Sequence, residues 1–202
     1  NMTPAPFTLA KQRAGYRMGD ATLVDSLLGD GLICTLKGYH MGMTAENIAA
    51  KYGLTREAQD RFALESQRRA VAAIEAGKFK DEIVPVEVPG KKGKITIVDT
   101  DEHPRPETTY EGLAALKPAF KPDGTVTAGN ASGMNDAAGA LVVSSAEFAE
   151  KRGLKPLARI VDYAAAALDP AYMGLGPILA TRKIMAKSGM NVDQMDIVEA
   201  NE

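Results

Sequence analysis

A dense block of small and polar residues constrains this sequence more than any other feature. It reads Thr-Ala-Gly-Asn-Ala-Ser-Gly-Met-Asn-Asp over residues 127–136. Gly129 and Gly133 can adopt backbone angles that other residues avoid, and they let the backbone approach a ligand closely. Short hydrogen-bonding side chains accompany them at Asn130, Ser132, Asn135 and Asp136. The block is therefore either a tight turn between two core strands or a binding loop.

Length and charge exclude several classes of protein. With 202 residues the chain can bury a substantial core, as one large domain or as two small ones. A formal net charge of −2 supplies no basic field for nucleic acid or for an acidic membrane surface. No apolar run reaches membrane-spanning length, and the first residues lack the pattern of a signal peptide. The single cysteine fits a reducing compartment. We therefore expect a cytoplasmic protein with no nucleic-acid or membrane partner.

Capping signals mark two consecutive helices before the block. Thr44 fits the N-cap of a helix that continues to about Tyr52, where Gly53 follows. Thr55 fits the N-cap of the longest helix, at residues 56–76. Such a pair also fits a DNA-binding helix-turn-helix motif. The acidic and basic residues of these helices balance, however, whereas a nucleic-acid-binding motif needs a basic face.

The rest of the chain alternates between apolar runs and helical patterns. Before the block we expect helices at residues 21–28 and around Leu113 and Leu116, and paired strands at residues 83–88 and 95–98. After the block, short apolar runs predict buried strands, and helices are expected to begin after Ser145 and at Pro177. This alternation is typical of a layered α/β domain. The predicted later strands lie at residues 140–143, 159–163 and 196–200.

Three other features have ordinary structural explanations. His40 lies between two glycines, and no second histidine or cysteine stands at metal-ligand spacing, so we expect no metal site. Residues 173–177, Met-Gly-Leu-Gly-Pro, lack the third glycine of a dinucleotide-binding fingerprint. Cys34 lies in an apolar stretch with no neighbouring base to activate it, so we expect a structural role.

The block resembles the Gly-Asn-Ala-Ser-Gly segment of the thiolase family, particularly of its acetyl-CoA acetyltransferases. Other stretches agree with the family in the same order, and the chain stops at the opening of the family's Asn-Glu-Ala-Phe motif. The resemblance covers the whole chain, which corresponds to about the middle half of such an enzyme. The agreeing stretches are residues 38–47, 79–85, 105–109, 116–120, 173–177 and 198–202.

The resemblance implies a layered α/β thiolase core with an inserted α+β loop domain, or lid domain. Residues 1–133 would form the lid domain that shapes the coenzyme A pocket. Residues 134–155 would end the N-terminal thiolase half, and residues 156–202 would begin the C-terminal half. Thiolases are generally homodimers or homotetramers, and residues 8–19 lie where a tetramerisation loop would be.

The family's reaction joins two acetyl-CoA molecules into acetoacetyl-CoA, or cleaves acetoacetyl-CoA in reverse, through an acyl-cysteine intermediate. Coenzyme A is substrate, and no cofactor is permanently bound. The family's two reactive cysteines and its catalytic histidine match no residue here, so we expect this chain alone to be inactive. Two alternatives stay open: a 3-ketoacyl-CoA thiolase of broader chain length and a non-catalytic coenzyme A-binding fragment.

The resemblance also implies roles for individual residues. Asn201 is the one catalytic candidate, because its counterpart holds a water that binds the thioester oxygen as it becomes negative. His40, Met41 and Met173 would line the acyl end of the pocket, where the two methionines favour short acyl groups. Arg105 would stack on the adenine of coenzyme A. The remaining expected coenzyme A contacts are Leu32, Gly112, Leu113, Leu116, Ala119, Phe120, Ala128, Ser132, Gly133 and Met134.

Overall fold

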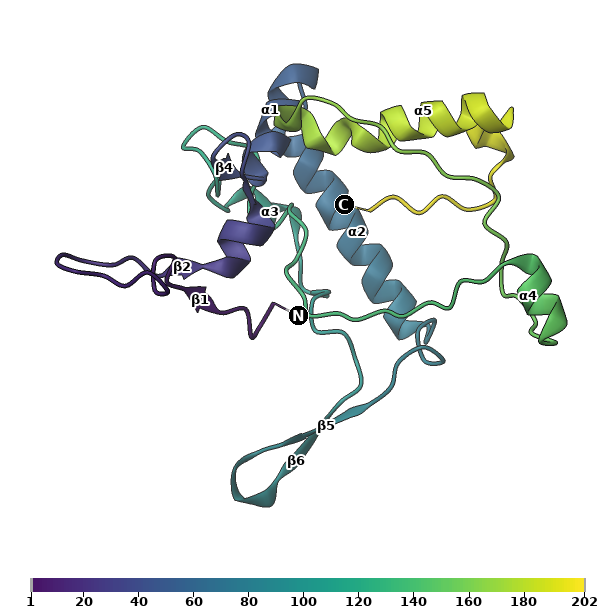
Figure 1. Ribbon diagram of the computed structural model, residues 1–202, viewed down its shortest axis with the longest axis horizontal. Helices are drawn as coiled ribbons and strands as arrows, with labels where there is room; N and C mark the ends of the chain where they lie inside the picture. Colours follow the sequence, from purple (N-terminus) through teal and green to yellow (C-terminus); the bar gives the residue numbers. More distant parts are fainter. Residues whose placement is uncertain (1, 202) are drawn as a thin grey trace. The chain divides into compact units, whose positions relative to one another are not determined.

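The computed structural model describes residues 2–201, which divide into two compact units (Figure 1). One unit is the continuous segment Ile48–Gly133. The other combines the residues up to Asn47 with those from Met134 onward, so it is discontinuous in sequence. Helix α1 (Gly42–Tyr52) contributes residues to both units.

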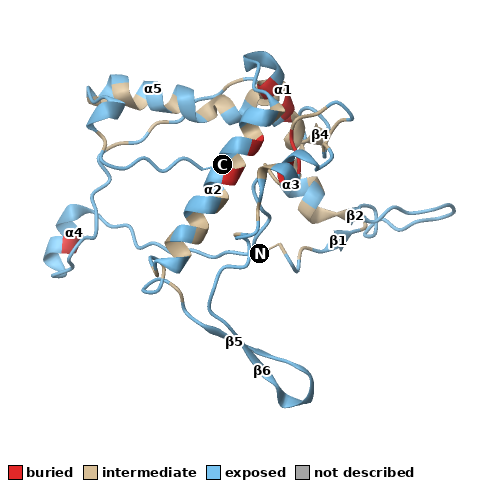
Figure 2. Cartoon of the chain, turned by 180° about the vertical axis from the view of Figure 1, so that it is seen from behind, coloured by how far each residue is buried: buried red, intermediate tan, exposed pale blue. Residues whose placement is uncertain are grey.

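The 48–133 unit is built around one long helix, α2 (Arg56–Glu75), which contacts the short helix α3 (Tyr110–Ala114). Both helices begin at a threonine N-cap. The Oγ1 of Thr55 accepts the N–H of Ala58 at 3.1 Å, and the Oγ1 of Thr109 accepts the N–H of Gly112 at 3.1 Å. Figure 2 shows buried residues on both helices. The buried apolar residues of this unit are Ala49, Leu64, Leu113 and Val126.

An antiparallel hairpin extends the same unit. Strand β5 (Val86–Pro89) pairs with β6 (Ile95–Val98), and Val86 stands opposite Val98 in the register. The short 3-10 segment η2 (Lys91–Gly93) forms the turn between them. All eight strand residues are exposed, so the hairpin contributes little to the core of this unit.

The discontinuous unit contains short elements joined by long connections. Strand β1 (Phe7–Thr8) pairs with β2 (Val24–Asp25), and β3 (Ile33–Cys34) pairs with β4 (Tyr39–His40), both antiparallel. Helix α5 is the longest helix that lies wholly in this unit. The helical segments are η1 (Leu27–Leu32), α4 (Ala146–Lys151), η3 (Pro170–Leu175), α5 (Gly176–Ser188) and η4 (Val192–Gln194).

Most predicted helices are confirmed, and so are most of the signals that mark their ends. Thr44 is an exception, because α1 begins at Gly42 and Thr44 lies inside the helix instead of capping it. Thr55 caps α2, Ser145 caps α4, and Pro177 lies in the first turn of α5. Gly189 follows α5 with a φ of 72°, the left-handed angle that favours glycine after a helix. The predicted hairpin is confirmed also. No described helix is both long and apolar enough to cross a membrane.

Several local predictions were wrong. Residues 21–28 form strand β2 and the start of η1 rather than one helix, and Leu116 lies beyond the end of α3. The apolar runs at residues 140–143, 159–163 and 196–200 are not strands. They are exposed instead of buried, with Leu141 at 92% and Val142 at 96% exposure. A strand needs a hydrogen-bonded neighbour, and the described residues supply none for these runs.

Candidate functional site

The first half of the small-residue block is a fixed loop, and neither of its flanks forms a strand. Asn130 closes this loop with both ends of its side chain. Its Oδ1 accepts the backbone N–H of Thr127 at 2.7 Å, and its Nδ2 donates to the carbonyl of Thr125 at 3.0 Å. The N–H of Gly129 donates to the Oγ1 of Thr127, which is fully buried. The alternative of a turn between two core strands is thereby excluded.

Two of the expected coenzyme A contacts, Leu113 and Leu116, pack against this loop at Gly129. A Cβ atom placed on Gly129 would lie 2.6 Å from the Cδ2 of Leu113 and 2.5 Å from the Cδ1 of Leu116. Only a residue without a side chain permits so close an approach. In addition, the N–H of Ala119 donates to the carbonyl of Val126 at 2.9 Å. The structure therefore brings Leu113, Leu116 and Ala119 together with the loop that carries Ala128.

A buried polar network joins the loop to both helices of the unit. The carboxylate of Asp60 on α2 is fully buried; it accepts from the Nδ2 of Asn130 at 2.9 Å and from the Nε of Arg56 at 2.7 Å. The Nη2 of Arg56 donates to the carbonyls of Leu113 and Leu116, at 2.6 and 3.1 Å. A buried charge needs partners of this kind. Gln59 adds a bond from its Nε2 to the Oγ1 of Thr125 at 2.9 Å.

Sequence reasoning missed Arg56 and Asp60. Their spacing of four residues on a helix was the available signal, because such residues face each other. The exposed pair Glu57–Arg61 has the same spacing on the same helix. Spacing alone therefore could not separate a buried pair from an exposed one.

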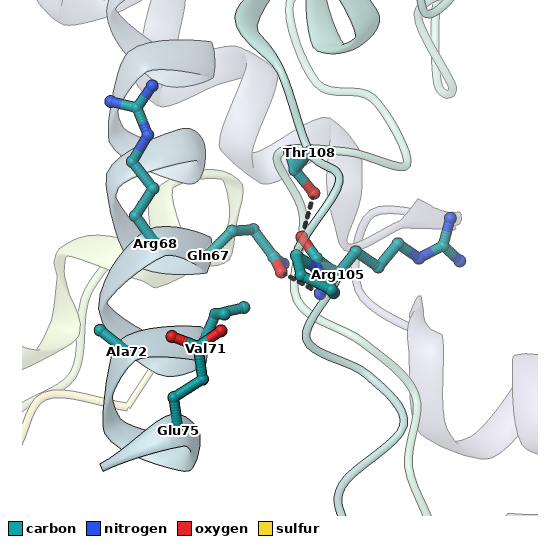
Figure 3. A pocket seen from close by; sticks show the side chains of 8 residues that line it. Gln67, Arg68, Val71, Ala72, Glu75, Arg105 and Thr108 are labelled. Carbon is teal, nitrogen blue, oxygen red and sulfur yellow. Dashed lines mark hydrogen bonds between the residues drawn. The ribbon is translucent and has the colours of Figure 1, made fainter.

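Arg105 lies beside a pocket of about 150 Å³ that α2 and the segment before α3 enclose (Figure 3). The backbone holds this segment in place: the N–H of Arg105 donates to the Oε1 of Gln67 at 2.8 Å, and the hydroxyl of Thr108 donates to the carbonyl of Arg105 at 2.8 Å. The exposed guanidinium extends away from α2 in Figure 3. An anchored backbone with an exposed guanidinium suits stacking on a planar group.

The other predicted site residues of this unit are exposed, except for the half-buried Phe120. Gly112 lies in the first turn of α3, Phe120 is half-buried after α3, and Ala128 is exposed in the loop. Ser132 and Gly133 are exposed and lie outside any helix or strand.

In the discontinuous unit, three predicted residues gather around β3 and β4. The N–H of Met41 donates to the carbonyl of Leu32 at 2.8 Å, which places Met41 at the end of the β3–β4 hairpin. The Nδ1 of His40 accepts the N–H of Gly42 at 3.0 Å. A neutral histidine that accepts at Nδ1 carries its proton on Nε2, so His40 has a hydrogen-bond donor at Nε2.

Asn47 joins the same region to the segment that carries Met173. Its Nδ2 donates to the carbonyl of Ala171 at 3.1 Å and to the hydroxyl of Tyr39 at 3.3 Å. An ion pair of 3.1 Å between Lys37 and Asp169 supports this junction, since Asp169 caps η3. The hydrogen bond with Asp169, together with its charge, raises the pKa of Lys37. Met173 lies in η3 and is half-exposed.

The second half of the block continues into this unit. Met134 is exposed, and Asp136 accepts hydrogen bonds from the backbone N–H groups of Met2 and Thr3. The hydroxyl of Thr3, followed by these N–H groups, lowers the pKa of Asp136. Asn201 is exposed in a segment after η4 that forms neither helix nor strand. Within residues 2–201, no three metal-ligating side chains form a cluster.

Family models match nearly the whole chain. The thiolase N-terminal domain matches residues 1–147, and the thiolase C-terminal domain matches residues 154–202. An acetyl-CoA acetyltransferase of Pseudomonas aeruginosa is 56% identical over 202 residues, which are 100% of this chain and 51% of that protein. The acetyl-CoA acetyltransferase of Escherichia coli is 53% identical over 203 residues, with the same coverage of 100% and 51%. The chain thus spans about half the length of the curated relatives it matches.

Solved structures agree with these matches. The acetyl-CoA acetyltransferase of Bacillus anthracis superposes with a TM-score of 0.87 at 44% identity, over 98% of this chain and 50% of that one. Human mitochondrial 3-ketoacyl-CoA thiolase gives a TM-score of 0.87 at 45% identity, over 97% and 49%. The predicted α/β fold class is confirmed, while the roles of single site residues stay predictions. The chain belongs to the thiolase family.

Proposed function

We propose that this chain serves in an acyl-CoA C-acetyltransferase that condenses two acetyl-CoA molecules to acetoacetyl-CoA or catalyses the thiolytic reversal. One observation carries the proposal: curated acetyl-CoA acetyltransferases are 50–56% identical to it across its full length. Within that enzyme the chain forms much of the coenzyme A pocket. Coenzyme A and its thioesters are substrates, and no permanent cofactor is required.

The proposed chemistry requires a nucleophile that the chain does not contain. A cysteine thiolate attacks the carbonyl of one acetyl-CoA, and coenzyme A leaves as a thiolate that takes up a proton. A second acetyl-CoA gives the proton next to its carbonyl to the thiolate of the family's second reactive cysteine. The resulting carbanion attacks the acetyl-enzyme, which releases the first cysteine as a thiolate. Cys34 pairs through its backbone with Tyr39 in the β3–β4 hairpin, and it does not match either reactive cysteine of the family. The half of the enzyme that this chain does not span would supply the nucleophile.

The chain's own residues would bind coenzyme A and stabilise developing charge. The apolar side chains of Leu113 and Leu116 and the loop at residues 125–130 form two adjoining walls, suited to the mostly apolar pantetheine arm. Arg105 would stack on adenine. Donors at His40 and Asn201 would act at the thioester end, where negative charge develops. We assign residues 1–133 to the lid domain, 134–155 to the end of the first thiolase half and 156–202 to the start of the second.

A broader acyl preference is the second candidate. The β-ketothiolase BktB of Cupriavidus necator is 52% identical over 203 residues, with coverage of 100% of this chain and 51% of that protein. Met41 and Met173 would narrow the acyl end of the pocket and so favour acetyl-CoA and acetoacetyl-CoA over longer substrates. A series of 3-ketoacyl-CoA chain lengths separates the two candidates.

We also propose a homodimer or homotetramer that works in the cytoplasm. The hairpin of β1 and β2 projects apolar side chains, with Met18 at 98% and Leu23 at 61% exposure. Exposed apolar side chains gathered on one projection fit a subunit contact. Residues 8–19 of this hairpin would serve as the tetramerisation loop.

A chimaeric enzyme tests the activity. In it, the 202 residues of this chain replace the matching half of the Pseudomonas aeruginosa relative, which then supplies the reactive cysteines. We expect the chimaera to cleave acetoacetyl-CoA in the presence of coenzyme A. A folded chimaera that cleaves neither acetoacetyl-CoA nor a longer 3-ketoacyl-CoA would overturn the proposal, and faster cleavage of longer substrates would favour the second candidate.

A further inference from the structure

Asp60 occupies an unusual place for an acidic residue. It lies on α2 with 0% exposure, and each of its carboxylate oxygens accepts a separate hydrogen bond. Burial of a charge is costly unless good partners replace water. Asp60 is buried and makes two hydrogen bonds in different directions, so it can connect two other parts of the structure.

The first connection reaches the loop at residues 125–130. The Nδ2 of Asn130 donates to Asp60 Oδ1 at 2.9 Å, while the same amide group closes the loop on Thr125 and Thr127. Asn130 therefore holds the shape of the loop, and Asp60 holds the closed loop against α2.

The second connection reaches the end of α3. Arg56 donates from Nε to Asp60 Oδ2 at 2.7 Å, which orients its guanidinium. The Nη2 of Arg56 then donates to the carbonyls of Leu113 and Leu116. Carbonyls at the C-terminal end of a helix need such external donors. Asp60 thus fixes, through Arg56, the backbone on which both leucines stand.

The two connections end on surfaces that touch each other. Gly129 of the loop packs against the side chains of Leu113 and Leu116, so the loop and the end of α3 form adjoining walls. We propose that Asp60 is a positioning residue that holds these two walls together as one surface for the pantetheine arm of coenzyme A. This inference rests on the proposed function, because that function places coenzyme A against this surface.

Neighbouring ion pairs on α2 provide an internal comparison. Glu57 with Arg61 and Glu65 with Arg69 have the same spacing of four residues, but all four side chains are exposed. Arg61 also lies over the Tyr110 ring of α3, whereas the printed contact of Arg69 is with Glu65 on α2 itself. Glu65 is therefore the matched control for Asp60: the same helix, an acidic residue and an arginine partner four positions later instead of earlier.

The decisive variant is Asp60→Asn in the chimaeric enzyme. One of its two side-chain positions becomes a donor, which faces either the Nε–H of Arg56 or the amide of Asn130, so one connection is lost. We expect the KM for coenzyme A to rise about tenfold, as the loss of one charge-assisted bond implies, and kcat to stay within about twofold. Amide hydrogen exchange should accelerate at residues 113–116 and 125–130. Glu65→Gln should change neither readout.

A second variant keeps the inference testable if Asp60→Asn does not fold. Asn130→Ala breaks the connection to the loop and leaves the Arg56–Asp60 ion pair in place, and we expect the same rise in KM with faster exchange at residues 125–130. Unchanged KM and exchange in a folded Asp60→Asn variant would overturn the inference. A variant with lower kcat and lower thermal stability but an unchanged KM would also overturn the inference. If the parent chimaera is inactive, the proposed function fails, whereas hydrogen exchange still tests whether Asp60 fixes the two walls.

Discussion

Gly129 shows at the scale of one residue how the small-residue block constrains the structure. Its φ is not in the left-handed region, so backbone conformation is not the reason for glycine there. The reason is the close approach of Leu113 and Leu116. Sequence reasoning allowed both explanations, and only the packed structure separates them.

Gly129→Ala should therefore destabilise the protein. The new methyl group would push against two leucine side chains, and overpacking of this kind costs about 1–3 kcal/mol. The free energy of unfolding, measured by urea titration and followed by far-UV circular dichroism, checks this expectation. Gly139→Ala is the matched control, because nothing lies within 4 Å of a Cβ atom there. Equal unfolding free energies for both variants would contradict the packing explanation.

At the scale of the element, helix α2 has the capping residue that its sequence predicts, whereas Thr44 lies inside α1 instead of capping it. Thr55 precedes a long amphipathic segment, and its hydroxyl accepts the N–H of Ala58 as the sequence pattern predicts. Gly77 follows the helix with a φ of 67°. These signals depend on residues within one turn, so they act whatever the rest of the chain does.

Thr55→Ala should cost about 1 kcal/mol of unfolding free energy, because the first turn of α2 loses an acceptor for one of its unsatisfied N–H groups. Thr55→Ser keeps the hydroxyl and should retain most of the stability. Urea titration gives the free energies, and exchange of the Ala58 amide reports the local effect. A Ser variant as unstable as the Ala variant would show that the hydroxyl is not the cause.

At the scale of the whole molecule, the discontinuous unit carries apolar runs without partners among the described residues. Leu157 is fully exposed, and Ile160, Val161 and Ile197 are largely exposed. Yet the path of the chain superposes on complete thiolases over 96–98% of its length. The runs at residues 140–143, 159–163 and 196–200 therefore stay unpaired and largely exposed within residues 2–201, although the family models cover them.

The chain by itself should show no turnover of acetoacetyl-CoA. The only cysteine in the sequence, Cys34, lies in the β3–β4 hairpin, and the family resemblance matches it with neither reactive cysteine. Cys34→Ser in the chimaeric enzyme should leave kcat unchanged, while iodoacetamide should still abolish activity. A spectrophotometric assay of acetoacetyl-CoA cleavage is run on the isolated chain, on the chimaeric enzyme and on its Cys34→Ser variant. Turnover by the isolated chain that is lost with Cys34→Ser would contradict this assignment.

The sequence by itself determined the family and most helix boundaries, and it located the small-residue block. Those features depend on short motifs and on capping residues such as Thr55, whose effects act within a few positions along the chain. Leu113 and Leu116 could be predicted as coenzyme A contacts from the family resemblance alone. That prediction needed no three-dimensional contact.

Only the tertiary structure decided which polar residues support the walls and which apolar runs are strands. Asp60 and Glu57 look alike in sequence, and they differ because the loop around Asn130 covers one and solvent covers the other. Residues 140–143 have strand composition but no neighbour to pair with among residues 2–201. Burial and strand pairing join residues that are far apart in the chain, so their outcome depends on the fold and not on the local pattern.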